Sequence, residues 1–191
     1  MNPTISSAKA TLFLALLVGA CSALPGGKSA DGHKGPALEL DRLQVGSVYG
    51  VGSRFSSDDI DFTVEAFGEG HGNAEVSLAA ALPGSAPHEG KKALRLSHAT
   101  LQFKTRDLGH MEFDFVDNGG PVALGIGGET LSGTSFIALS GSKIGTARIE
   151  VQESSTAGVR HGRVIVSGSL PQVTISGSNL VLADLRLARG D

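Results

Sequence analysis

Apolar and polar residues alternate in short runs along most of the chain, which is the period of a β-strand with one buried face. In the clearest run, Met111, Phe113 and Phe115 occupy every second position. The positions between them hold the acidic Glu112 and Asp114, so we expect both phenylalanines to be buried and both carboxylates to face outward. The same alternation predicts further strands at residues 61–67, 74–80, 121–126, 146–152, 162–167, 172–176 and 179–187.

The segments between these runs carry turn residues. Residues 117–120 (DNGG) and 127–128 (GG) tolerate a positive φ angle, as tight hairpin connections require. Residues 154–161 predict a longer polar loop, residues 82–92 predict the longest loop, and residues 131–139 predict at most a short helical turn. Since no window keeps a helical period for three turns, the predicted fold class is all-β, an antiparallel β-sandwich.

In one run, the apolar residues switch from even-numbered to odd-numbered positions. Up to Leu96 the apolar residues occupy even positions, whereas from Ala99 to Phe103 they occupy odd ones. Because successive side chains of a strand point to opposite faces, both sets reach one core only if the backbone gains a residue or bends. The sequence therefore predicts a β-bulge, or a strand that crosses between two sheets, near Ser97 and His98.

The N-terminal residues have the pattern of a secretory signal peptide. Lys9 precedes an apolar run that is shorter than the roughly 20 residues needed to span a membrane. The run ends in Val18-Gly19-Ala20-Cys21, which resembles the lipobox of bacterial lipoproteins. The resemblance implies that diacylglycerol is attached to the Cys21 sulfur, that residues 1–20 are removed, and that the new N-terminus is acylated.

The residues after the lipobox predict a tether. Residues 22–36 (SALPGGKSADGHKGP) are small, polar, Gly or Pro, a composition typical of flexible linkers, and 15 residues extend to about 50 Å. We expect a signal peptide (1–20), a lipidated cysteine with its tether (21–37) and a β-sandwich domain (38–191). In enterobacterial lipoproteins an Asp after the lipidated cysteine favours the inner membrane, so Ser22 resembles the outer-membrane default.

Three later segments carry a second resemblance. MEFDFVDNGGPVALGIGG, FIALSGSKIG and VTISGSNLVLADLRL follow each other from residue 111 to the C-terminal strand. In this order they resemble a group of uncharacterised bacterial exported jelly-roll modules, which are similar in shape to galactose-binding-like and carbohydrate-binding sandwiches. Such modules often close with an apolar strand that carries an Asp, here Asp184. The resemblance implies a jelly-roll-like sandwich and no particular activity.

Composition argues against several classes of function. The 16 Lys and Arg are interspersed with 19 Asp and Glu, and the net charge of −3 becomes −4 when Lys9, the one charged residue of positions 1–20, is removed. Without a basic patch, nucleic-acid binding is not expected. Cys21 is the only cysteine, so the domain has no internal disulfide and relies on its core. With no Trp and only Tyr49, the chain favours protein binding over sugar binding.

No catalytic or cofactor motif is complete, so we expect neither an enzyme nor a cofactor. The segment SGSK at residues 140–143 matches the Ser-x-x-Lys of penicillin-recognising enzymes, but the partner motif Lys-Thr-Gly is missing. The pair HE at residues 88–89 begins a zinc-protease motif, but Lys92 stands where its second His belongs. Glu112 and Asp114 remain as a candidate acid pair. The histidines lack metal-ligand spacing; they are His33, His71, His88, His98, His110 and His161.

One acidic cluster is a candidate calcium site. Asp58, Asp59 and Asp61 precede or begin a predicted strand, and Asp184 on the closing strand adds a ligand if the two strands meet. Carboxylate oxygens are the ligands that Ca²⁺ prefers. The alternative is a solvated loop and strand face, which the missing EF-hand spacing favours.

The sequence leaves three classes of function. The first is an envelope lipoprotein with a non-catalytic β-sandwich that binds another protein or a cell-wall component, or has a structural role. The second is a hydrolase, which would require Glu112, Asp114 and either His110 or His161 to converge in a cleft. The third is a lipid- or ligand-carrying barrel, which would enclose a large apolar cavity.

Overall fold

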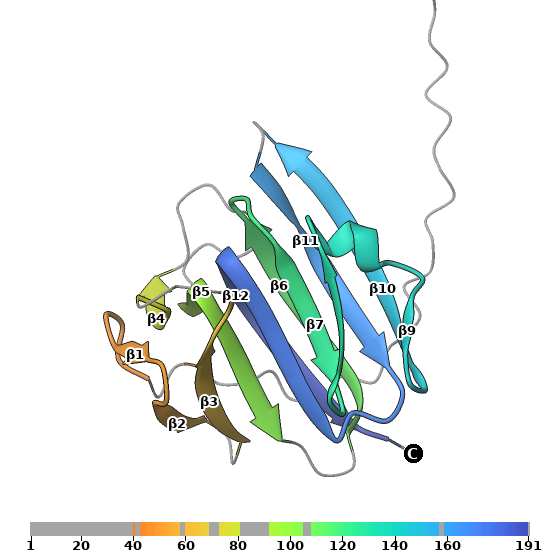
Figure 1. Ribbon diagram of the computed structural model, residues 1–191, viewed down its shortest axis with the longest axis horizontal. Coiled ribbons are helices and arrows are strands. Elements are labelled where there is room, and N and C mark those ends of the chain that lie inside the picture. Colours follow the sequence, from red (N-terminus) through yellow and green to blue (C-terminus); the bar gives the residue numbers. More distant parts are fainter. Residues whose placement is uncertain are drawn as a thin grey trace, which may run out of the picture. The chain divides into compact units, whose positions relative to one another are not determined.

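The computed structural model describes residues 40, 43–57, 60–68, 73–80, 92–104, 108–156 and 159–190, which form an antiparallel β-sandwich (Figure 1). The predicted fold class is therefore confirmed. The described strands are β1 (Val48–Gly50), β2 (Arg54–Ser57), β3 (Ile60–Ala66), β4 (Glu75–Ala80), β5 (Lys92–Lys104), β6 (Leu108–Asp117), β7 (Val122–Ile126), β8 (Glu129–Gly133), β9 (Lys143–Ile144), β10 (Ala147–Thr156), β11 (Val159–Ser167) and β12 (Gln172–Arg189). A 3-10 helix, η2, covers Phe136–Leu139.

All twelve strands belong to one hydrogen-bonded sheet. It forms two layers because the two central strands, β5 and β12, each pair with strands of both layers. The first half of β5 pairs with β4 and its second half with β3. The first half of β12 pairs with β7 and its second half with β6. The first layer thus holds β1, β4, β6, β11, β10 and β9, and the second holds β2, β3, β7 and β8. Figure 1 shows β5 and β12 side by side in the middle.

The position at which β5 changes layers is the one that the sequence predicts. His98 has a φ angle of 47°, in the left-handed region that only a few residue types adopt readily. Ser97 pairs with β4, whereas Ala99 pairs with β3. Leu96 before the bend and Ala99 after it both lie in the hydrophobic core. The predicted irregularity near Ser97 and His98 is confirmed.

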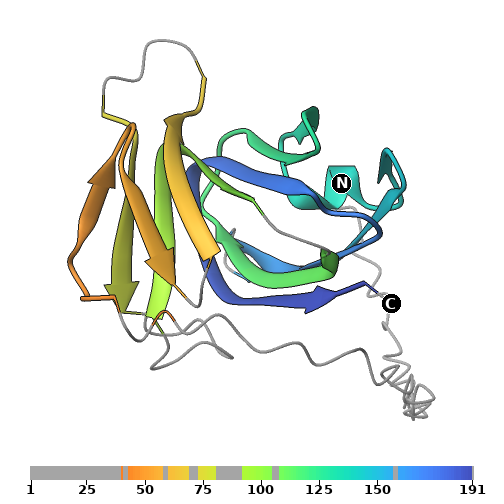
Figure 2. The ribbon, with the colours of Figure 1, turned by 90° about the horizontal axis from the view of Figure 1, so that it is seen from below.

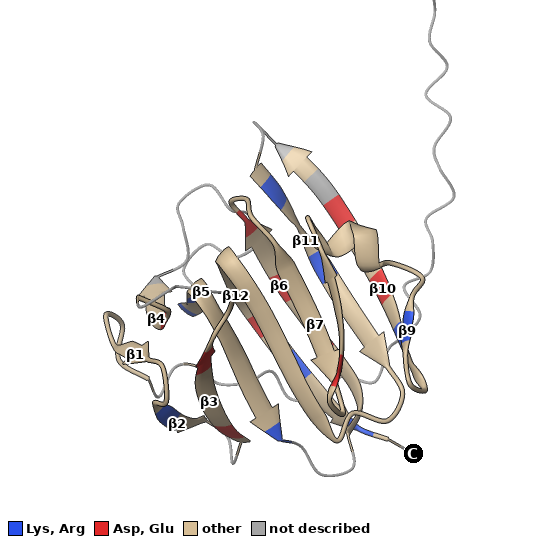
Figure 3. Ribbon diagram, in the orientation of Figure 1, with Lys and Arg blue, Asp and Glu red and all other residues tan. Residues whose placement is uncertain are grey.

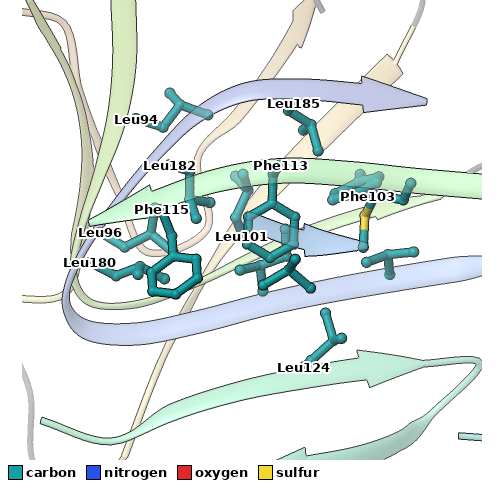
Figure 4. Packing of buried hydrophobic residues seen from close by; sticks show 14 of the residues in the cluster. Leu94, Leu96, Leu101, Phe103, Phe113, Phe115, Leu124, Leu180, Leu182 and Leu185 are labelled. Atoms are coloured by element: carbon teal, nitrogen blue, oxygen red, sulfur yellow. The ribbon is translucent and has the colours of Figure 1, made fainter. Parts of the chain in front are cut away.

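Phenylalanine side chains fill the centre of the core. Phe113 and Phe115 have relative exposures of 0% and 1%, so their predicted burial is confirmed. Phe136 of η2 packs edge-on against both rings, with centroid distances of 5.6 and 5.0 Å. Figure 4 shows side chains of β6 and Leu124 of β7 in the same interior. The strands from the first half of the chain gather on one side of Figure 2 and the later strands on the other.

The predicted connections are confirmed in some places and wrong in others. The loop expected at residues 154–161 is mostly strand, since β10 runs to Thr156 and β11 begins at Val159. A polar sequence can pair in this way, because the ladder uses backbone groups. The runs at 172–176 and 179–187 are one strand, β12. Residues 127–128 join β7 and β8 as a tight hairpin, and η2 is the short helical turn expected within 131–139.

The tetrapeptide at residues 117–120 is a tight turn but not a hairpin. Gly119 and Gly120 have φ angles of 105° and 97°, as predicted. However, β6 pairs with β11 and β12, whereas β7 pairs with β8 and β12, so the turn carries the chain from one layer to the other. Asp117 fixes it: its Oδ1 accepts a hydrogen bond from the Gly119 N–H at 2.8 Å.

Candidate functional site

The candidate acid pair and its charged neighbours lie on the outer face of the first layer. Alternation in β6 turns Phe113 and Phe115 inward, so Glu112 and Asp114 lie on the opposite face. Cross-strand register places Arg163 of β11 opposite Asp114 and Arg186 of β12 opposite Glu112. Figure 3 shows acidic and basic residues on the neighbouring strands β6, β11 and β12. We define the outer-face cluster as His110, Glu112, Asp114, His161, Arg163, Asp184 and Arg186.

Asp114 and Arg163 form the strongest contact of the cluster. Arg163 Nε and Nη2 donate hydrogen bonds to Asp114 Oδ1 and Oδ2, at 2.6 and 2.9 Å. Asp114 has a relative exposure of only 3%. Hydrogen bonding of the Arg163 guanidinium to Asp114 is the largest influence on the pKa of Arg163 and raises it, while partial burial opposes the shift. The charges of Asp114, Glu112 and Asp184 raise this pKa further.

Glu112 is held by a second arginine. Arg186 Nη1 donates a hydrogen bond to Glu112 Oε1 at 3.2 Å. His110 Nε2 lies 3.9 Å from Glu112 Oε2, which is too long for a hydrogen bond. His110 Nδ1 and Ser167 Oγ are 3.4 Å apart, at the outer limit of a hydrogen bond. The predicted acid pair is therefore a pair of carboxylates that are each bound to an arginine.

A small apolar group lies beside the ion pairs. Ala93, Val116, Val181 and Ala183 form a buried cluster that is separate from the main core. Val181 pairs with Val116, and Ala183 pairs with Asp114. Because apolar neighbours exclude water, they strengthen the Asp114–Arg163 interaction while making an unpaired charge there costly. The outer face is thus partly buried, which alternation alone does not indicate.

Asp184 lies at a β-bulge in β12. Its φ angle is 48°, and the pairing of β12 with β6 shifts register between Ala183 and Arg186. Leu182 before this bulge and Leu185 after it both reach the core. Asp tolerates the left-handed conformation better than most residues, so it suits a bulge.

The calcium hypothesis stays a prediction. Asp58 and Asp59 lie outside the described residues. Asp61 is exposed in β3 and accepts a hydrogen bond from Ser56 Oγ at 2.5 Å, and β5 lies between β3 and the strand of Asp184. Within the part of the chain that the structure describes, no group of three or more His, Cys, Asp or Glu residues is placed to hold a metal ion.

Several other predicted residues lie outside the described ranges. They include the lipobox with Cys21, the tether, most of the loop at residues 82–92, and His33, His71 and His88. In the described ranges, no helix is long and apolar enough to cross a membrane. The segment SGSK has a structural role: Ser140 Oγ accepts a hydrogen bond from the Val151 N–H at 3.0 Å.

Sequence reasoning missed the two arginines that hold the acid pair. Arg163 lies 49 residues from Asp114, and Arg186 lies 74 residues from Glu112. No local pattern connects them, because β6 pairs with strands far along the chain. The only available signal was the alternation of β11, which puts Arg163 on the polar face and Val164 in the core.

Comparison with known proteins adds no relationship: no family model, no curated protein and no solved structure matches this chain.

Proposed function

We propose that this protein is a cell-envelope lipoprotein, anchored through Cys21 and placed in the outer membrane, whose β-sandwich is a non-catalytic binding or structural domain. The lipobox Val18-Gly19-Ala20-Cys21 supports the anchor. Two acyl chains hold a protein stably at a bilayer. The partner is a protein or a cell-wall component of the envelope.

The observation that carries the non-catalytic assignment is the pairing of Glu112 and Asp114 with arginines. A general acid or base must reach its substrate and exchange a proton with it. Asp114 has both carboxylate oxygens bound to Arg163 and is almost fully buried. Glu112 is bound to Arg186. These contacts suit a rigid sheet face better than a reaction centre.

A free strand edge supports binding of another protein. Among the described residues, the edge of β10 from Ala147 to Val151 is covered: β9 pairs with Ala147 and Arg148, Ile149 exchanges backbone hydrogen bonds with Gly141 and Ser142, and Ser140 Oγ accepts a hydrogen bond from the Val151 N–H. From Gln152 to Thr156 the ladder described for β10 is the one with β11, on its other side. An extended segment of a partner can add to such an edge through backbone hydrogen bonds.

The anchor is tested by replacing the acylated residue. Wild-type protein from detergent-solubilised envelopes should show a mass that corresponds to acylated Cys21 with residues 1–20 removed. Cys21→Ala should instead accumulate as uncleaved precursor or as protein released from the membrane. An unmodified Cys21 in mature, membrane-free wild-type protein would contradict the proposal.

A hydrolase is the second candidate, because His110 and Glu112 are neighbours and both side chains are about one-fifth exposed, at 22% and 20%. Incubation of the lipidated protein with purified cell-wall sacculi separates the two classes. The binding proposal expects cosedimentation or cross-linking without soluble fragments. Fragments released by wild type and not by Glu112→Gln would establish the hydrolase instead.

A further inference from the structure

Three exposed valines mark one edge of the first layer. Val45, Val48 and Val51 have relative exposures of 48%, 58% and 57%. They belong to the segment QVGSVYGVGS, in which Val-Gly-Ser occurs twice around the short strand β1. We call these three residues the valine edge. In the described part of the chain, the other exposed large apolar residues, Ile137 and Val159, are isolated from it in sequence.

Two similar turns present this edge. The Ser47 N–H donates to the Gln44 carbonyl at 3.0 Å, and the Ser53 N–H donates to the Gly50 carbonyl at 3.0 Å. In both turns a valine precedes a glycine with positive φ, 90° at Gly46 and 83° at Gly52. Such turns usually carry Pro or polar residues at the position of the valine. The requirements of the turns therefore do not explain why exposed β-branched residues occupy these two positions.

Between the turns, β1 presents the third valine on the same edge. Tyr49 stacks on Phe55 with a centroid distance of 4.3 Å and packs against the core. Since neighbouring side chains of a strand point to opposite faces, Val48 faces outward. Val48 pairs with Ser77, which pairs with the exposed Arg95, so a basic side chain shares this face.

We propose that the valine edge rests on the membrane to which the chain is anchored. This inference depends on the lipidation of Cys21 proposed above. Leu40 is buried at 6% exposure, and the Leu43 carbonyl accepts a hydrogen bond from Lys92 Nζ at 2.9 Å, so the chain enters the sandwich directly before Val45.

The length of the tether keeps this edge near the bilayer. Eighteen residues separate Cys21 from Leu40, and a segment of this length spans about 65 Å when fully extended and about 25 Å as a flexible coil. Tethering raises the local concentration of lipid at the edge, so a weak apolar contact is enough. Arg95 and Arg54, which directly follows the second turn, suit anionic headgroups, although Glu75 opposite Gly50 reduces this attraction.

The absence of tryptophan from the sequence makes the contact measurable. Val51→Trp introduces a single reporter at the edge. Ile137→Trp is the matched control, since Ile137 is exposed to 45% in η2, which lies away from β1 (Figure 1). Both variants are purified with acylated Cys21, checked by mass, and reconstituted into vesicles of phosphatidylethanolamine and phosphatidylglycerol. Circular dichroism verifies that each variant is folded.

The expected result is a blue-shifted emission from Val51→Trp and quenching by brominated lipid several-fold stronger than for Ile137→Trp. Adding Val48→Asp to Val51→Trp should return the emission toward that of the control. Equal, solvent-like emission from both variants with acylated Cys21 overturns this inference and leaves the lipoprotein assignment intact. A shift that requires envelope proteins and does not occur with vesicles alone also overturns it, in favour of a protein partner. Unacylated Cys21 overturns the lipoprotein assignment and this inference together.

Discussion

Removing Arg163 and removing Asp114 should lower the free energy of unfolding by different amounts, because the two side chains differ in burial. The Asp114 side chain is 5% exposed, whereas that of Arg163 is 37% exposed. Arg163→Leu leaves a buried carboxylate without its arginine, which should lower the free energy of unfolding by about 3–5 kcal/mol. Asp114→Ala leaves a guanidinium that can reach water, so we expect a smaller loss of about 1–2 kcal/mol. Urea unfolding measures both values.

The exposed pair of Arg148 and Glu150 is the control for this prediction. Their side chains are 64% and 60% exposed at a distance of 3.5 Å, so Arg148→Ala should cost less than about 1 kcal/mol. A guanidinium whose pKa is raised on folding contributes stability below its unfolded pKa and loses it only as the pH rises through the folded pKa. Because the pKa of an arginine lies far above neutral pH and that of Arg163 is raised further, titration of Arg163 adds no pH dependence near neutrality. Equal losses for Arg163→Leu and Asp114→Ala would contradict the assigned burial of the carboxylate.

At the scale of the elements, two bent strands make this sandwich possible. His98 in β5 and Asp184 in β12 are the two described non-glycine residues with positive φ. Each lies where the core-facing residues of its strand change from even to odd positions. β-Branched residues are strained in this conformation, whereas Asn tolerates it. His98→Val should therefore be less stable than His98→Asn by about 1–2 kcal/mol. The two variants lose the same imidazole, so their difference isolates the backbone; identical thermal midpoints would show that His98 does not set the bend.

Period-two patterns located most strands because each strand has one apolar face that the core must cover. The bend at His98 was predictable for the same reason, since Leu96 and Ala99 cannot otherwise share a core. Short strands such as β1 and β9 have too few residues to show a period, and residues 154–156 are too polar to be read as strand. The outer-face cluster was only half predictable: alternation grouped Glu112 with Asp114, but the arginines depend on which distant strands pair.

At the scale of the whole molecule, β5 and β12 couple the two layers. Each strand donates and accepts ladder hydrogen bonds in both layers, so neither layer can separate without breaking pairs in the other. The core is correspondingly continuous: one cluster extends from Phe55 in β2 to Val166 in β11. This connectivity favours a single cooperative unfolding transition.

Two optical probes can test this coupling with one substitution. Phe113 is fully buried in β6 against Phe136, so Phe113→Ala should lower the free energy of unfolding by about 3–5 kcal/mol. Tyr49, the only tyrosine in a chain without tryptophan, reports on the distant end of the sandwich, where it stacks on Phe55. Because the layers share their central strands, Tyr49 fluorescence and far-ultraviolet circular dichroism should shift to the same lower denaturant midpoint. If the Tyr49 midpoint stayed at its wild-type value while the circular dichroism midpoint fell, the β1–β2 end would unfold independently of β6, and the shared central strands would not suffice to make unfolding cooperative.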